Sequence, residues 1–298
     1  MSATPLEPAW LDRALYPFAP HHAQVRDGRM HYVDEGRGPV VLFVHGTPSW
    51  SFEWRHLIRA LASSHRCVAP DLLGFGLSER PRAFGYTPAD HARALADFVA
   101  ALRLERFALV VHDFGGPIGL PLCLEHPERV THLALLNTWM WSFADDPQMA
   151  RAGRLIGGGL GRLLYRALNL SPRVILRQAW RRREMLTAAV HRHYLGPFPD
   201  WWSREHVLWT LARELLGSSD YYAALWSRRE RLLGRPTAVV WGLADPAFRP
   251  DHLARWRGAL PDARVAGLPG VGHWPQEEAH EVVARELTAL LAASPRRD

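Results

Sequence analysis

The chain has 298 residues, of which 48% are hydrophobic and 22% charged, and its formal net charge is +6 at pH 7. No apolar stretch is long enough to span a membrane, and the stretch 1–20 lacks the apolar core of a signal peptide, so we expect a cytoplasmic protein without membrane insertion. Cys67 and Cys123 are too few for a disulfide framework. The length suits one large domain, or a core with an insertion.

Short apolar runs predict strands, and helical patterns lie between most of them. A helix is expected from Pro88 to Leu104, with Thr87 as its N-cap. Such alternation is typical of a mostly parallel sheet that is covered by helices on both faces. The predicted strands are Met30–Glu35, Val40–Val44, Cys67–Pro70, Ala108–Val111, His132–Asn137, Thr237–Trp241 and Arg264–Leu268.

Two glycine-containing loops follow the early strands. His45-Gly46-Thr47-Pro48 comes directly after the run Val40–Val44. The second loop, Asp71–Ser78, contains glycines but neither the lysine of a phosphate-binding loop nor the spacing of a dinucleotide fingerprint. We therefore interpret the second loop as structural, and no nucleotide cofactor is expected.

Asp113 stands where a buried strand turns into a helix that opens with Gly115 and Gly116. Such an abrupt turn exposes the side chain of its turn residue and requires small neighbours, as in the nucleophile elbow G-x-S-x-G. An Asx-turn or helix N-cap is the alternative role for this aspartate. A carboxylate that attacks an acyl group gives an anhydride, whereas attack at an sp3 carbon gives an ordinary ester. An aspartate at this position therefore predicts alkyl transfer.

Between Trp139 and Arg235 the strand signals vanish and helical spacing dominates. We predict a core formed by residues 1–138 and 236–298, with a helical cap at 139–235 that roofs the nucleophile and excludes water. Residues 151–235 carry 16 arginines against 6 acidic residues, and the chain contains no lysine. We interpret these arginines as solvating the outer faces of the cap helices, rather than as a binding surface for nucleic acid or membranes.

Two further polar residues follow the last predicted strands. Asp245 comes after Thr237–Trp241, and His273 comes after Arg264–Leu268. Individually they could be a turn residue before a proline and one of sixteen histidines. Together with Asp113 they give the chain order nucleophile, acid, base at three strand ends, which is the order of an α/β-hydrolase catalytic triad.

Motifs recur in the segments His45–Arg55, Val68–Pro81, His112–Gly116, Trp241–Pro246 and Gly272-His273. In these segments the sequence resembles the haloalkane dehalogenase family of Asp-nucleophile α/β-hydrolases. The resemblance implies the α/β-hydrolase fold, a mostly parallel central sheet flanked by helices, with an inserted helical cap. It also implies Asp113 as nucleophile, His273 as general base and Asp245 as the acid that orients it. The backbone amides of Thr47 and Phe114 would form the oxyanion hole.

The sequence departs from the family at the leaving-group site. The family holds the halide with a tryptophan directly after the nucleophile and with a second donor, which is an Asn or Glu two residues after the histidine of His-Gly-x-Pro or a cap tryptophan. Here these core positions hold Phe114 and Thr47, so weak dehalogenation is expected. Trp139 and Trp141 could supply indole donors or could simply pack at the seam between core and cap. The position that part of the family uses for the acid is Asn137, which cannot serve, and this favours Asp245.

The expected reaction needs no cofactor or metal, only a small apolar electrophilic substrate and water, and no nucleic acid partner is expected. The sequence does not determine the leaving group of this reaction. A halide, a β-lactone and an epoxide are the alternatives, and similar epoxide hydrolases use cap tyrosines. The less favoured reading is a non-catalytic ligand-binding homologue. The sequence leaves the oligomeric state open. The cap segment and its surroundings offer Tyr165, Tyr194, Tyr221 and Tyr222.

Overall fold

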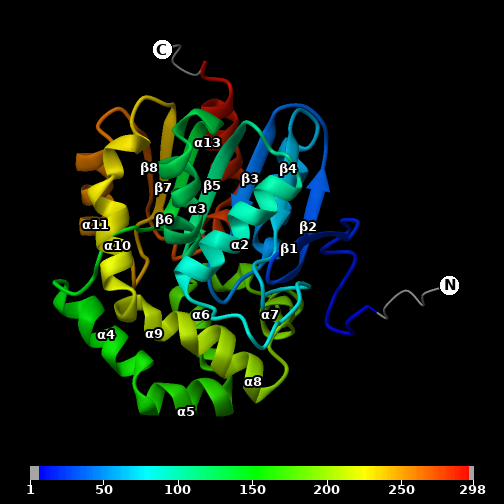
Figure 1. The fold of residues 1–298 in the computed structure, drawn as a ribbon, viewed down its shortest axis with the longest axis vertical. Coiled ribbons are helices and arrows are strands. Elements are labelled where there is room, and N and C mark those ends of the chain that lie inside the picture. The colour runs from blue at the N-terminus through cyan, green and yellow to red at the C-terminus, as the bar shows by residue number, and fades with distance from the viewer. Residues whose placement is uncertain (1–6, 295–298) are drawn as a thin grey trace.

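A computed structural model describes residues 7–294, which form an eight-stranded sheet with the strand order β1-β2-β4-β3-β5-β6-β7-β8 (Figure 1). β1 and β2 are antiparallel, β2 pairs antiparallel with β4, and every pairing from β4 to β8 is parallel. Residues 1–6, which belong to the stretch 1–20 that we compared with a signal peptide, lie outside the described residues. So do residues 295–298, the end of the predicted core segment 236–298.

The predicted strands are confirmed, and β3 and β8 have the predicted bounds. The other predicted strands extend by one to three residues, because the sheet continues to pair beyond the purely apolar run. β1 was not predicted, because its sequence His-His-Ala-Gln-Val lacks a continuous apolar signal. The observed bounds are β1 His21–Val25, β2 Gly28–Glu35, β3 Val40–Val44, β4 Arg66–Pro70, β5 Phe107–Asp113, β6 Val130–Thr138, β7 Thr237–Gly242 and β8 Arg264–Leu268.

Helices cover both faces of the sheet. α2 (Pro88–Ala101) packs against α3 (Gly115–Glu125) on one face, while α1 (Arg55–Leu61) packs against α13 (His280–Leu291) on the other (Figure 1). The short helices α11 (Pro250–Ala259) and α12 (Pro275–Glu278) follow β7 and β8. All seven residues of β5 are buried, which places the hydrophobic core on both sides of the central strands.

The predicted N-cap of α2 is present as a reciprocal capping box. The side chain of Thr87 accepts a hydrogen bond from the Asp90 backbone N–H, and the Asp90 carboxylate accepts one from the Thr87 backbone N–H. The helix ends at Ala101 rather than at Leu104, because Arg103 adopts a left-handed backbone conformation with φ 51°.

The segment between β6 and β7 contains helices and no strand of the described sheet. Figure 1 shows α4, α5, α8 and α9 as a layer below the carboxyl ends of the parallel strands. No helix of residues 7–294 is long and apolar enough to cross a bilayer. The helices of this segment are α4 (Pro147–Gly157), α5 (Gly159–Leu168), α6 (Leu176–Ala179), α7 (Ala188–Leu195), α8 (Trp201–Ser203), α9 (Thr210–Gly217) and α10 (Ser219–Ser227), with π-helical stretches at Ser171–Ile175 and Arg204–Trp209.

Candidate active site

The turn between β5 and α3 holds Asp113 in the left-handed region, with φ 52°. Non-glycine residues rarely adopt this conformation, so the turn is strained and must be held by its surroundings. A Cβ on Gly115 would lie 2.1 Å from the Val44 carbonyl oxygen, and one on Gly116 would lie 2.0 Å from Oγ1 of Thr138. Larger residues would therefore displace the turn. The two glycines allow the strand to enter the helix at once and leave the aspartate at the carboxyl end of the sheet.

His273 lies between two carboxylates. Its Nδ1 is 2.7 Å from Oδ2 of Asp245, and its Nε2 is 3.3 Å from Oδ2 of Asp113. The three side chains come from loops that follow β5, β7 and β8, and all three residues are buried. Because Nδ1 is turned toward Asp245, Nε2 is the nitrogen that faces the turn at Asp113. The three residues predicted from the order of strand ends thus lie in one hydrogen-bonded chain.

Asp245 is held by two further donors. The Ala247 backbone N–H donates to Oδ1 at 2.8 Å, and Nδ2 of Asn137 donates to Oδ2 at 2.8 Å. Asn137 is itself fixed to β7, because its Oδ1 accepts from the Gly242 backbone N–H at 2.8 Å. The residue at the alternative acid position is therefore a hydrogen-bond donor to the acid.

The two carboxylates dominate the protonation of the histidine. Burial by itself would lower the pKa of His273, but the charge of Asp245 and the hydrogen bond and charge of Asp113 raise it to about 10. Burial likewise opposes ionisation of Asp245, yet the neighbouring His273 lowers the pKa of this carboxyl. At neutral pH the free site therefore holds an imidazolium between two carboxylates.

The other oxygen of Asp113, Oδ1, accepts a hydrogen bond from the backbone. The N–H of Thr47 donates to Oδ1 at 2.9 Å, while Oδ2 faces His273. The loop approaches so closely because Gly46 has no side chain: a Cβ there would lie 2.3 Å from Oδ1 of Asp113 and 2.7 Å from the Phe114 backbone nitrogen. Of the two amides that we predicted as an oxyanion hole, that of Thr47 contacts the carboxylate directly, and the nitrogen of Phe114 lies beside the same Gly46 backbone.

A cavity of about 130 Å³ opens above Asp113. Its wall is mostly apolar and combines strand-end residues of the core with residues of the segment between β6 and β7. Sequence reasoning identified only some of these residues, because the apolar ones carry no motif. The lining residues are Thr47, Pro48, Asp113, Phe114, Trp139, Met149, Ile156, Tyr165, Ser171, Ile175, Ala179, Ala212, Leu215, Ala247, Phe248, His273 and Trp274.

The two tryptophans that we predicted for the leaving-group pocket have different positions. Trp139 lines the cavity and meets Phe114 edge to face, with ring centroids 4.7 Å apart. Trp141 is not among the residues that line this cavity. Its ring packs against Trp226 and Trp256, because the chain between β6 and α4 turns it toward α10 and α11. Trp139 and Trp141, two residues apart in the chain, thus line different cavities of the protein.

Several polar hydrogens at the cavity have no hydrogen-bond partner among residues 7–294. They belong to Nε1 of Trp139, Oγ1 of Thr47 and Nε1 of Trp274, and all three atoms are buried. Buried donors are normally paired, because an unpaired one loses its water without compensation. Unpaired donors around an apolar cavity therefore indicate a place for an acceptor that a substrate brings.

Only one of the four candidate tyrosines lines the cavity. Tyr165 does so, and burial raises the pKa of its hydroxyl, which stays protonated. The other three hydroxyls donate elsewhere: Tyr194 to Glu277, Tyr221 to the Pro117 carbonyl and Tyr222 to the Glu214 carbonyl. The described residues therefore do not place two tyrosines together above Asp113.

A buried histidine connects the nucleophile strand with the loop of the base. Nε2 of His112 lies 2.8 Å from the His273 carbonyl oxygen, and its Nδ1 lies 3.2 Å from Glu53. The loop is also tied to the segment above the sheet, because the His273 backbone N–H donates to the Ala179 carbonyl at 3.1 Å. His112, which directly precedes Asp113 in β5, therefore connects the turn of the candidate nucleophile with the loop that carries His273.

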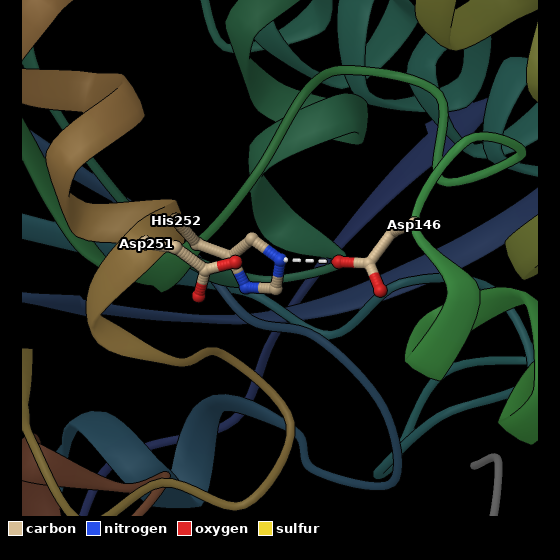
Figure 2. A group of neighbouring side chains, drawn as sticks. All are labelled: Asp146, Asp251 and His252. Carbon is tan, nitrogen blue, oxygen red and sulfur yellow. Dashed lines mark hydrogen bonds and ion pairs between the residues drawn. The ribbon is translucent and has the colours of Figure 1, made fainter.

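A second polar cluster lies at the start of α4 and α11. Ligand atoms of Asp146, Asp251 and His252 lie within 4.8 Å of one another, and His252 Nε2 is 3.1 Å from Asp146 (Figure 2). Arg249 donates to both carboxylates, at 2.7 and 2.8 Å. Burial opposes ionisation of Asp146, but the Met149 N–H and Arg249 lower the pKa of its carboxyl to about 2. Because Arg249 already supplies the positive charge, we interpret this cluster as an ion-pair network.

The comparisons with known proteins agree with this geometry. The family model described as "alpha/beta hydrolase fold" matches residues 39–280. Haloalkane dehalogenase 2 of Mycobacterium tuberculosis is 37% identical over 93% of this chain and 96% of its own length. Cis-3-alkyl-4-alkyloxetan-2-one decarboxylase of Shewanella oneidensis is 33% identical over 92% of this chain and 88% of its own. The crystal structure of haloalkane dehalogenase DbeA from Bradyrhizobium elkani superimposes with a TM-score of 0.84, at 26% identity over 93% of this chain and 100% of that one.

Proposed function

Since this chain belongs to the α/β-hydrolase family and, within it, to the haloalkane dehalogenases and their relatives, we propose that it cleaves a bond between an sp3 carbon and a leaving group through a covalent ester on Asp113. The observation that carries the proposal is that the two oxygens of this carboxylate have different hydrogen-bonding and ion-pair partners. Oδ1 accepts the Thr47 N–H, Oδ2 faces His273, and Asp113 lines the cavity. Oδ2 is the oxygen available for attack.

In the first half-reaction Oδ2 of Asp113 displaces the leaving group from carbon and becomes an alkyl ester. This step removes one of the two negative charges that hold the proton on His273, so the pKa of the imidazolium falls from about 10. The imidazolium then releases its proton to solvent. The chemistry of the first step therefore generates the base that the second step needs.

In the second half-reaction neutral His273 removes a proton from water, which attacks the carbonyl carbon of the Asp113 ester. The negative charge develops on Oδ1, where the N–H groups of Thr47 and Phe114 stabilise it. Collapse of the tetrahedral intermediate releases the alcohol, restores the carboxylate and leaves His273 protonated. Asp245 stabilises the imidazolium through Nδ1 and fixes the orientation of the ring.

Two leaving-group classes fit the donors above Asp113. A halide, and the carboxylate that departs when the sp3 carbon of an oxetan-2-one ring is attacked, both leave as anions that accept hydrogen bonds. Trp139 and Thr47 offer unpaired donors for such an anion. An epoxide oxygen needs a proton instead, and Tyr165 is the one candidate tyrosine at the cavity. We therefore favour the halide and β-lactone classes over the epoxide.

The small apolar cavity suits a small apolar substrate, and water is the co-substrate. We also propose a cytoplasmic location, because Cys67 and Cys123 are both buried free thiols that form no disulfide. A panel of chloro-, bromo- and iodoalkanes, terminal epoxides, β-lactones and aryl esters would identify the leaving group. A catalytically idle ligand-binding protein would turn over none of them, and the proposal would then fail.

The test of the covalent step is the His273→Gln variant. Because the first half-reaction does not use a base, this variant should be alkylated once and then stall. Mass spectrometry should locate one added alkyl group on the peptide that contains Asp113. As a control, Asp113→Ala should show neither added mass nor turnover. Full turnover by Asp113→Ala would overturn the assignment of the nucleophile.

A further inference from the structure

Large apolar side chains are exposed on the outer side of α4 and α5. Leu155 is 63% exposed, Leu160 is 60% exposed and Leu163 is 59% exposed. Leu160 and Leu163 are three residues apart on α5 and therefore share one face, while the buried Gly161 and Tyr165 face inward. Trp201, half exposed on α8, adjoins this helix, since its ring lies 4.4 Å beneath the guanidinium of Arg166. We call these four exposed residues and their neighbouring arginines, Arg151 and Arg154, the outer cap surface.

The charge around the exposed leucines has one sign. Residues 147–183 contain nine arginines and neither Asp nor Glu. Arg151 lies four residues before Leu155 and so shares its face of α4. Arg162 and Arg166 pair with Glu205, but Arg151 and Arg154 form no ion pair among residues 7–294. The surface therefore combines exposed apolar groups with arginines that have no acidic partner.

The same helices carry the inner wall of the cavity. Met149 and Ile156 of α4 and Tyr165 of α5 line the space above Asp113, while Leu155 and Leu160 face outward. In Figure 1, α4 and α5 form the lowest layer of the molecule, at the end remote from α13. The outer cap surface and the active site are thus the two sides of one thin layer of helices.

We propose that the outer cap surface binds an anionic lipid bilayer, with its leucines and Trp201 at the level of the headgroups and its arginines on the lipid phosphates. For Arg151 and Arg154 this proposal replaces the solvating role that we expected from the sequence, because the exposed leucines beside them could not be placed from the sequence alone. Helices with leucine or tryptophan on one face and arginine beside it are suited to this position, lying on the membrane without crossing it. A second copy of the chain fits less well, because it would bring arginines against arginines. Nucleic acid would account for the arginines but not for the exposed leucines.

Membrane binding by this surface would affect how the substrate reaches the active site. This part of the inference rests on the proposed function. Apolar alkyl halides and alkyl-substituted lactones partition into bilayers rather than remaining in water. With the outer cap surface on the membrane, a substrate that leaves the lipid would have only the helices between β6 and β7 between it and Asp113. The protein would then draw its substrate from the lipid phase.

Sedimentation with lipid vesicles tests the interaction without any substrate, so a failure of the proposed function would not affect the result. Vesicles of phosphatidylcholine alone are compared with vesicles that contain phosphatidylglycerol in addition. The protein should sediment with the anionic vesicles, and added salt should weaken the binding. The double variant Leu160→Ser/Leu163→Ser should lower the partition coefficient by about tenfold. Arg151→Gln/Arg154→Gln should lower it by a similar factor on anionic vesicles only.

Matched variants at the opposite end of the molecule serve as controls. Leu233→Ser, before β7, removes an exposed leucine, and Arg285→Gln, on α13, removes an exposed arginine. Both should bind vesicles like the wild type, and circular dichroism should show that all variants are folded. The proposal would be overturned by absence of sedimentation, by binding that the cap variants leave unchanged, or by self-association through this surface in place of lipid binding.

Discussion

The two walls of the catalytic cavity are built differently. The core wall presents Asp113, Thr47 and His273 at strand ends, and they are held by hydrogen bonds of 2.7 and 2.9 Å and by the ion pair between His273 and Asp113. The cap wall presents apolar side chains such as Met149 and Ile156, which are held by packing alone. We therefore expect the core wall to determine which bond is broken, and the wall formed by the segment between β6 and β7 to determine which molecule reaches it. Substitutions in the two walls should affect different steps.

The largest effect is expected at the acid. Asp245→Asn removes the charge that stabilises the imidazolium of His273 and should lower kcat by about 10⁴-fold. Asn137→Ala removes one donor to Asp245 and leaves its charge, so a loss of about tenfold is expected, as for one peripheral hydrogen bond to a charged group. Steady-state kinetics of both variants test this ranking. The reverse order would move the acid function to position 137.

A methyl group on the core loop should be the next most damaging change. In Gly46→Ala the new Cβ would lie 2.3 Å from Oδ1 of Asp113, so the Thr47 N–H must move away from the developing oxyanion. Loss of one such donor lowers kcat by about 10²–10³-fold. Gly159→Ala in the cap is the matched control, because a Cβ there meets nothing within 4 Å. Equal activity of the two variants would contradict the role of the loop.

The two predicted tryptophans offer a smaller and more specific test. Trp139→Phe keeps the ring at the cavity but removes its unpaired N–H, so kcat/KM for bromoalkanes should fall by about 10- to 100-fold. Trp141→Phe makes the same change outside the cavity and should leave this value unaltered. The loss in Trp139→Phe should be smaller with less basic leaving anions such as iodide. An unchanged Trp139→Phe enzyme would show that another donor holds the leaving group.

The smallest effect concerns the pH dependence of stability. The pKa of His273 is about 10 in the folded protein and about 6.5 when unfolded. Because the folded value is the higher one, this group stabilises the fold fully below about pH 6.5, and the stabilisation is lost as the pH rises through about 10. Urea unfolding from pH 6 to 10 should therefore show a larger loss of stability for the wild type than for His273→Gln. In Asp113→Asn the loss should be smaller and should end at lower pH, because the missing carboxylate lowers the folded-state pKa of His273.

The difference between the two walls of the cavity also explains which residues could be predicted from the sequence and which could not. Strand ends in the core carry polar residues next to glycine or proline, and an α/β fold brings the carboxyl ends of parallel strands to one edge. Chain order was therefore enough to identify Asp113, Asp245 and His273. In the cap, Ile156 and Leu155 are adjacent apolar residues, yet one lines the cavity and the other faces solvent. No motif distinguishes them.

The sequence by itself determined the fold class, the residues at the strand ends and the aspartate at the turn after β5, because buried strands and tight glycine turns leave a local pattern. Only the tertiary structure decided which way each residue of an irregular segment points. Trp139 faces the cavity and Trp141 faces α11, although they are two residues apart. It also decided that the outer side of α4 and α5 stays uncovered. Such choices depend on how helices pack on one another, and packing involves residues that are far apart in the chain.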